Sequence, residues 1–235
     1  MRSVAIHYNP NIDWQGARAR DFSSGLKALG IPHDTTESRN KVSDVSILFG
    51  TTYWRGVEEE PGYLLVDRAS VGDPEYVQLV WDGHGKRGDH KAPDNVGDDR
   101  WRALNLPYPP DPVNGYLDTV ICGQTETYSP NWASLEDWYD SIPDATHFRP
   151  HPKGNNPTGL PAKRGALGLD KYHVLNSSIA VEAILSGLHV QIHDAGSLAY
   201  GIGERASWAH WLAYTQWSWQ EIAEGEPIRH LFEDI

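Results

Sequence analysis

Short apolar runs alternate with longer polar or amphipathic stretches along the chain. In the first half, four apolar runs predict buried strands at 3–8, 45–49, 63–66 and 75–81. Between the first two runs, apolar residues recur at helical spacing over 17–29, and Gly30 followed by Pro32 ends this predicted helix. Strands that alternate with helices favour an α/β fold built on a largely parallel sheet.

The alternation restarts after a long irregular stretch. The pattern predicts strands at 117–122 and 145–149, with a helix near 134–139 between them. Residues 172–194 then read as a strand, a serine pair, a short helix, a glycine turn and a second strand. This second set of α/β elements indicates a second lobe.

The stretch between the two sets, 82–114, is rich in Gly, Pro and Asp and has no sustained periodicity. We therefore expect a long loop, a feature that is often functional, with one short helix near 98–104. The sequence LPYPPDPVNG at 106–115 marks the boundary between the lobes, because proline-rich segments interrupt regular structure.

The C-terminal segment is predicted to be helical. Apolar residues at helical spacing cover 204–215, and Ser218 with Glu221 forms a capping box for a further short helix that Gly225 ends. The fold class is therefore predicted as α/β, with two Rossmann-like lobes and C-terminal helices that pack across them. The three parts are expected at 1–112, 113–203 and 204–235.

Composition narrows the class of protein. The 235 residues contain no apolar run near 18 residues, and the N-terminus lacks the basic start and long apolar stretch of a signal peptide, so we expect a soluble, cytoplasmic protein without membrane partners. The net charge of -12 opposes general attraction to nucleic acid, although basic residues gather at 149–171. The single cysteine, Cys122, lies in an apolar run and is expected to be a buried thiol.

Candidate chemistry begins with the helix inside 172–194. Its N-terminus follows a strand and is led by Ser177 and Ser178, which makes it a good place for a phosphate. Glu182 lies one turn after Ser178 as a lone carboxylate on an apolar helix, which needs protein donors or a ligand hydroxyl as a partner. The alternative is an ordinary capped core helix.

A second candidate is the loop THFRPHPK that follows the strand at 145–149. The prolines favour an extended chain, and alternation then places Arg149, His151 and Lys153 on one side. Together with the serine-led helix they would form a cationic cradle for a diphosphate. The alternative is a solvated basic loop.

These motifs carry a family resemblance. RPHP followed by N-S-S-x-x-x-E-A-x-x-x-G-x-x-V resembles the donor-binding half of GT-B type glycosyltransferases and related CDP-glycerol or capsule-type transferases, over about 117–200. The resemblance implies a reduced GT-B-like protein that binds a nucleotide sugar, foremost a UDP-sugar, without an obligatory cofactor or metal. It places Arg149, His151, Ser177 and Ser178 near phosphate and Glu182 at the ribose, and makes 1–112 an acceptor-side lobe. Nucleotide-sugar epimerases are similar too, so the reaction type stays open.

The tail, WAHWLAYTQWSWQEIAEGEPIRHLF, is similar to the ending of small phage-encoded proteins related to transferases that decorate DNA bases. That likeness implies a hydroxymethylated base in phage DNA as the acceptor, in the host cytoplasm. The acidic charge argues instead for a small molecule or a polysaccharide. A CDP-alditol phosphotransferase and a non-catalytic nucleotide-binding protein are further alternatives.

Acid and base candidates come from the first lobe. Asp67 ends an apolar strand, where α/β sites gather, and Arg68 beside it is either a phosphate contact or its structural ion-pair partner. Asp13 is the alternative base, and Trp14 and Gly16 beside it are candidates to contact acceptor and phosphate. The histidines and aspartates of WDGHGKRGDH lack a recognised ligand spacing, so no metal site is expected.

Overall fold

The computed structural model describes residues 3–38, 40, 42–50, 62–71, 75–92, 96–106, 108–124, 132–152, 154 and 157–232. The chain divides into two compact units. Unit 1 comprises Met1–His84, Gly88–Leu104 and His210–Ile235, and unit 2 comprises Gly85–Arg87 and Asn105–Ala209. Among the described residues, none of the helices combines the length and the apolarity needed to cross a membrane.

Unit 1 is built on a six-stranded sheet with the order β10-β5-β4-β3-β1-β2. Its strands are β1 (Val4–His7), β2 (His33–Thr36), β3 (Val45–Phe49), β4 (Tyr63–Arg68), β5 (Tyr76–Trp81) and β10 (Gln216–Ser218). The first four are parallel, β5 runs antiparallel to β4, and β10 runs antiparallel to β5. Strands β1 and β3 are buried along their whole length, as their apolar runs predict.

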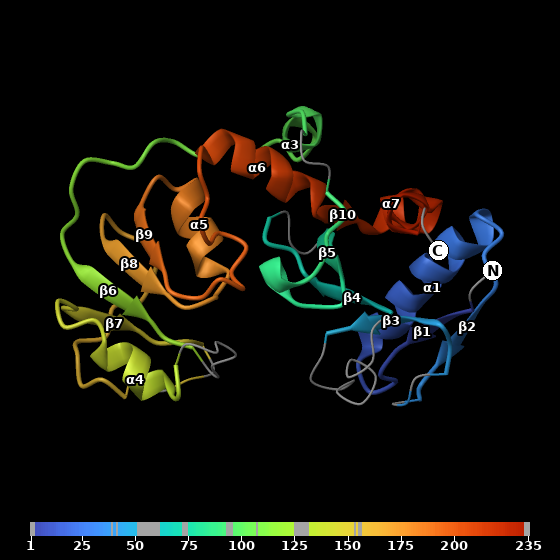
Figure 1. The fold of residues 1–235 in the computed structure, drawn as a ribbon, viewed down its shortest axis with the longest axis horizontal. Helices are drawn as coiled ribbons and strands as arrows, with labels where there is room; N and C mark the ends of the chain where they lie inside the picture. Colours follow the sequence, from blue (N-terminus) through green and yellow to red (C-terminus); the bar gives the residue numbers. More distant parts are fainter. Residues whose placement is uncertain are drawn as a thin grey trace. The chain divides into compact units, whose positions relative to one another are not determined.

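The long helix of unit 1, α1 (Asp13–Ala28), begins four residues before the predicted start. It lies beside α7 (Trp219–Glu224), which α8 (Glu226–Leu231) follows (Figure 1). A Cβ atom on Gly25 would come within 2.1 Å of the Ile222 carbonyl oxygen, so a glycine is required for this close approach. The capping box of Ser218 is confirmed, as is the left-handed Gly225 at the end of α7.

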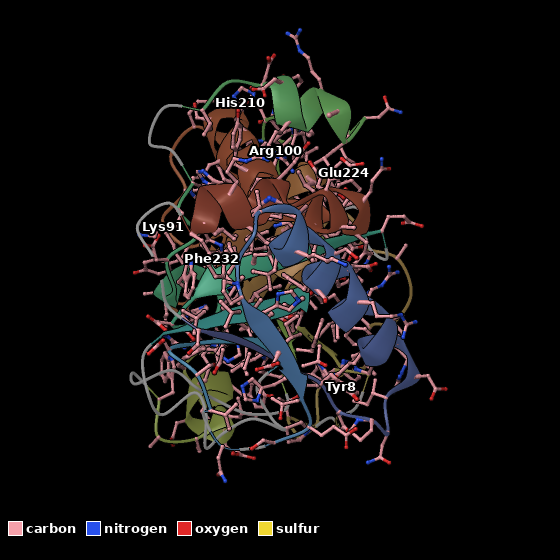
Figure 2. All side chains as sticks on the ribbon, turned by 90° about the vertical axis from the view of Figure 1, so that its right-hand side faces the viewer. Tyr8, Lys91, Arg100, His210, Glu224 and Phe232 are labelled. Carbon is pink, nitrogen blue, oxygen red and sulfur yellow. The ribbon has the colours of Figure 1, made fainter. Side chains whose placement is uncertain are left out.

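Arg100 belongs to α3 (Asp99–Ala103), and its side chain contacts the C-terminal tail. Figure 2 shows it between α3 and the tail. Its guanidinium donates to Glu221 Oε1 at 2.8 Å and to the Gln216 carbonyl at 2.6 Å, and it stacks 4.2 Å from the centre of the Trp217 ring. Such a fork with a carboxylate, a carbonyl and an aromatic ring suits arginine and not lysine. The short helix expected at 98–104 thus fastens the tail within unit 1.

Unit 2 contains a four-stranded, fully parallel sheet in the order β7-β6-β8-β9. The strands are β6 (Thr119–Cys122), β7 (His147–Arg149), β8 (Lys171–Val174) and β9 (His189–Ile192). Figure 1 shows α4 (Leu135–Asp140) beside β7, and α5 (Ile179–Leu185) beside β8 and β9. The α/β fold class is confirmed: both units contain adjacent parallel strands and strand-to-helix connections, and the sheet of unit 1 adds two antiparallel strands.

The last element of unit 2 is the start of α6 (Arg205–Tyr214), whose residues from His210 onward belong to unit 1. Arg205 donates to the carbonyls of Pro110, Ile184 and Leu188 at 3.0 to 3.2 Å. The proline-rich stretch therefore packs within unit 2. The boundaries at 112/113 and 203/204, and the packing of C-terminal helices across the lobes, stay predictions.

Candidate functional site

Four loops meet at one edge of the unit 2 sheet. Because its strands are all parallel, their carboxyl ends lie on the same side, where α/β proteins bind ligands. The loops begin at Gly123 after β6, Pro150 after β7, Leu175 after β8 and His193 after β9. We call this the carboxyl edge of unit 2.

The RPHP loop lies directly against the loop after β6. The Gly123 amide donates to the Arg149 carbonyl at 2.8 Å. A Cβ atom on Gly123 would meet Phe148 Cζ at 2.7 Å and the His151 amide nitrogen at 3.0 Å, so any larger residue would push the two loops apart. Lys153, the third predicted cation of this loop, lies outside the described residues.

Two predicted site residues act on the same buried thiol. Cys122 at the end of β6 is paired in register with Arg149, and burial raises the pKa of the thiol to about 12, which Arg149 lowers and Glu182 raises by their charges. The charges of Arg149 on β7 and Glu182 on α5 are thus both felt at the end of β6. Cys122 is buried, as predicted, and its thiol is neutral at physiological pH.

The serine-led helix has an unused cap. Ser178 occupies the N-cap position in a helical conformation, and its side chain makes no capping hydrogen bond, while Ser177 Oγ accepts weakly from the Ile179 amide at 3.5 Å. The Ser178 hydroxyl is exposed and does not cap this helix. Contrary to the prediction from sequence, Glu182 does not need a protein or ligand partner, because its side chain is exposed and water can solvate the carboxylate.

A buried carboxylate that sequence reasoning missed sits beside this helix. Asp194 is 1% exposed and accepts from Arg87 Nη2 at 2.6 Å, from the Gly196 amide at 2.8 Å and from Asn176 Nδ2 at 3.0 Å. Asn176 in turn accepts from Gln124 Nε2 at 2.6 Å. The polar pair at the end of β9, His-Asp before Ala-Gly, is the sequence signal that could have pointed to Asp194.

In unit 1, Asp67 and Arg68 end β4. Asp67 Oδ1 accepts from the backbone amide of Arg68 at 2.8 Å, and its Oδ2 lies 4.0 Å from His84 Nδ1. The Asp67 and His84 side chains are each about half exposed, at 47% and 48%. Since β4 is parallel to β3 and β1, Asp67 lies at the carboxyl end of the unit 1 sheet.

Asp13, Trp14 and Gly16 lie at the start of α1, in the connection that follows β1. Asp13 is exposed, and Trp14 is 52% exposed with its ring edge-on to Phe49 at 5.8 Å between centres. No atom would lie within 4 Å of a Cβ atom on Gly16. These residues therefore share the carboxyl end of the unit 1 sheet with Asp67.

The acids of WDGHGKRGDH have structural partners. Asp82 Oδ1 accepts from the amides of Gly62 and Tyr63 at 2.7 and 2.9 Å, and Asp89 forms an ion pair with Lys91 at 3.2 Å. Within the part of the chain that the structure describes, no group of three or more His, Cys, Asp or Glu side chains could hold a metal ion.

The parallel strands and strand-to-helix connections of both units define an α/β protein of Rossmann-like type. No family model matches the chain, and no curated protein does. Among solved structures the chain is similar to KpsC of Thermosulfurimonas dismutans, a beta Kdo 2,4 transferase, with a TM-score of 0.52 and 12% sequence identity. The match covers 91% of this chain and 89% of that chain, so the likeness shows a shared fold over nearly the whole length.

Proposed function

We propose that the protein is a glycosyltransferase of GT-B type that binds a nucleotide sugar at the carboxyl edge of unit 2. The observation that carries the proposal is the strand order. Strands β7 and β8 flank β6, so the RPHP loop and the serine-led helix follow the two strands on either side of β6, and the charges of Arg149 and Glu182 both influence the pKa of Cys122 at the end of β6. The transferase fold shared with KpsC supports the same class of reaction.

In this proposal the basic loop and the serine-led helix hold the diphosphate of the donor. Arg149 and Lys153 supply cationic donors, and the His151 ring and the hydroxyls of Ser177 and Ser178 supply further donors. As the bond to the sugar breaks, negative charge grows on the leaving diphosphate, and these preorganised donors stabilise it. Glu182, exposed on the same helix, accepts hydrogen bonds from the ribose hydroxyls of a UDP-sugar.

Activation of the acceptor is assigned to unit 1. Asp67 or Asp13 takes the proton of the acceptor hydroxyl as its oxygen attacks the sugar. Trp14, Gly16 and Arg68 are proposed contacts of the acceptor or of phosphate. No metal or further cofactor is needed, because protein cations balance the charge of the leaving group.

The acceptor is proposed to be a sugar hydroxyl. The net charge of -12 disfavours a DNA polyanion, and the protein of similar fold, KpsC, is a beta Kdo 2,4 transferase. A hydroxymethylated base in phage DNA is the competing proposal. A steep fall in affinity for hydroxymethylated DNA with rising salt would support the DNA acceptor and overturn the sugar acceptor.

The donor site is tested by Glu182→Ala with calorimetry. We expect the variant to lose measurable binding of UDP and of UDP-sugars that raise the melting temperature of the wild-type protein. Glu136→Ala is the matched control, because Glu136 is also an exposed helical glutamate of unit 2, on α4. Unchanged binding by Glu182→Ala would remove the ribose assignment.

Turnover separates the proposal from its alternatives. A glycosyltransferase releases the nucleotide and moves the sugar, an epimerase keeps the two joined, and a CDP-alditol phosphotransferase moves a phosphoalditol group. Tight nucleotide binding without any of these products would identify a non-catalytic nucleotide-binding protein.

A further inference from the structure

Four polar side chains form a continuous hydrogen-bond relay at the carboxyl edge of unit 2. Arg87 donates to Asp194 at 2.6 Å, Asn176 donates to the other oxygen of Asp194 at 3.0 Å, and Gln124 donates to Asn176 at 2.6 Å. The relay joins the loops after β6, β8 and β9 to the 3₁₀ turn Gly85–Arg87.

The direction of the relay is fixed at its charged end. Asp194 is buried and ion-paired with Arg87, and an ionised carboxylate can only accept hydrogen bonds. Asn176 must therefore turn its NH₂ group to Asp194, which leaves its carbonyl oxygen for Gln124. Gln124 must then donate to Asn176 from its own NH₂ group. The charge of Asp194 therefore fixes the orientation of both amides, which would otherwise have to be assigned. The Oε1 carbonyl of Gln124 is the last group of the relay and is not used within it.

Gln124 stands between the two loops of the proposed donor site. It follows Gly123, which contacts the RPHP loop, and it bonds to Asn176, which directly precedes the serine pair. Its backbone amide is anchored on the Tyr139 hydroxyl at 3.4 Å. Its side chain is half-buried, and none of the described residues donates a hydrogen bond to Oε1.

We propose that Gln124 determines specificity at this edge by accepting a hydrogen bond from a hydroxyl group of the bound donor, an inference that rests on the proposed function. Arg87, Asp194 and Asn176 are positioning residues that fix the orientation of the Gln124 amide, so that its NH₂ group bonds to Asn176 and its carbonyl oxygen does not. A ligand group that can only accept cannot form a hydrogen bond with this carbonyl oxygen. The site therefore selects a donor whose hydroxyl lies here over an analogue with a hydrogen-bond acceptor in its place.

The test compares UDP-glucose with analogues in which one hydroxyl of the glucose or of the ribose is replaced by fluorine. Fluorine matches the polarity of the hydroxyl but cannot donate. We expect the wild-type protein to bind the analogue altered at one particular position about tenfold more weakly than UDP-glucose, the effect of one net hydrogen bond. In Gln124→Leu that difference should vanish, while the differences at the other positions remain.

A second variant tests the relay without touching Gln124. In Asp194→Asn the buried group can donate or accept, so Asn176 and Gln124 can turn over, and discrimination at the sensitive position should shrink although Gln124 is intact. Gln191→Leu, at an exposed position of β9, is the control for loss of a glutamine in the same sheet. A merely structural relay would change the melting temperature and leave the ranking of analogues as it is in the wild type.

The outcomes separate this inference from the proposed donor. If the wild-type protein binds UDP-glucose and Gln124→Leu ranks every analogue as the wild type does, the role of Gln124 is overturned and the donor proposal stands. If the wild-type protein binds neither UDP nor any UDP-sugar, the UDP-sugar donor and this inference are both overturned.

Discussion

A buried histidine pair in unit 2 makes stability depend on pH at the scale of single residues. His173 is 3% exposed, and its Nδ1 lies 3.0 Å from His193 Nε2. Burial, with the charges of Lys171 and His193, lowers the pKa of His173 to about 4, and burial also lowers the pKa of His193. Both rings are therefore neutral in the folded protein at neutral pH.

The sign of the pH effect follows from proton binding. An unfolded histidine takes up a proton near pH 6.5, whereas folded His173 resists protonation down to about pH 4, so the unfolded state binds more protons between these values. Stability should fall as the pH is lowered from 6.5 toward 4. Melting temperatures across this range should show a smaller decline for His173→Phe, and an undiminished decline for His84→Phe, whose side chain is half exposed. Equal declines in both variants would contradict the prediction.

Lys163 neutralises a buried carboxylate at the amino ends of the unit 2 strands, opposite the carboxyl edge. Its Nζ lies 2.7 Å from Asp170, which is 1% exposed, and 2.7 Å from Asp118. Lys163→Met should destabilise unit 2 by about 3 kcal/mol, because Asp170 would remain buried without its cation. Urea unfolding measures the loss, and Arg164→Met at the exposed neighbouring position should change it by less than about 0.5 kcal/mol. A loss equal to that of the control would show that the pair contributes little.

At the scale of elements, alanine substitutions at two glycines of α1 should have opposite effects on stability. Gly25→Ala places a methyl group against the Ile222 carbonyl and should cost about 2 kcal/mol or more, as overpacking does. Gly16→Ala meets open space and should stabilise α1 by about 0.5 to 1 kcal/mol through helix propensity. Chemical denaturation of the two variants gives the comparison. If Gly25→Ala were as stable as Gly16→Ala, α7 would not be held closely against α1.

Elements with strong local signals could be predicted from the sequence. The apolar strands β1, β3 and β6 and the capping box at Ser218 depend on neighbouring residues, and each lies where the pattern placed it. Strand β2, with the polar sequence HDTT, and β10, with three residues, were missed. Both are edge strands that a neighbouring strand stabilises through backbone hydrogen bonds, and such pairing leaves little trace in hydrophobicity.

The candidate site could be predicted only in its local parts. The strand-loop and strand-helix motifs around Arg149 and Ser178 were recognisable, because each lies within a few residues. The relay was not, since Gln124 bonds to a residue 52 positions away and Arg87 to one 107 positions away. The exposure of Glu182 could not be predicted from the sequence either. Helical spacing shows which face of the helix a residue occupies, but not what packs against that face.

At the scale of the whole molecule, both units place their candidate residues at the carboxyl ends of parallel strands. This arrangement is a general property of α/β sheets. A chain with 12% identity to KpsC can therefore share its fold, but the shared fold does not identify the site residues. The binding and turnover experiments therefore test the site residues directly.

The two units differ in how their sequence is arranged. Unit 1 includes β10, α7 and α8 from the C-terminal part of the chain. Unit 2 is formed by the continuous stretch Asn105–Ala209 and by the short segment Gly85–Arg87. During synthesis, every segment of unit 2 emerges from the ribosome before the last strand of unit 1 does. Unit 2 should therefore reach its native sheet first, while the apolar face of α1 waits for the residues around Ile222 that cover it.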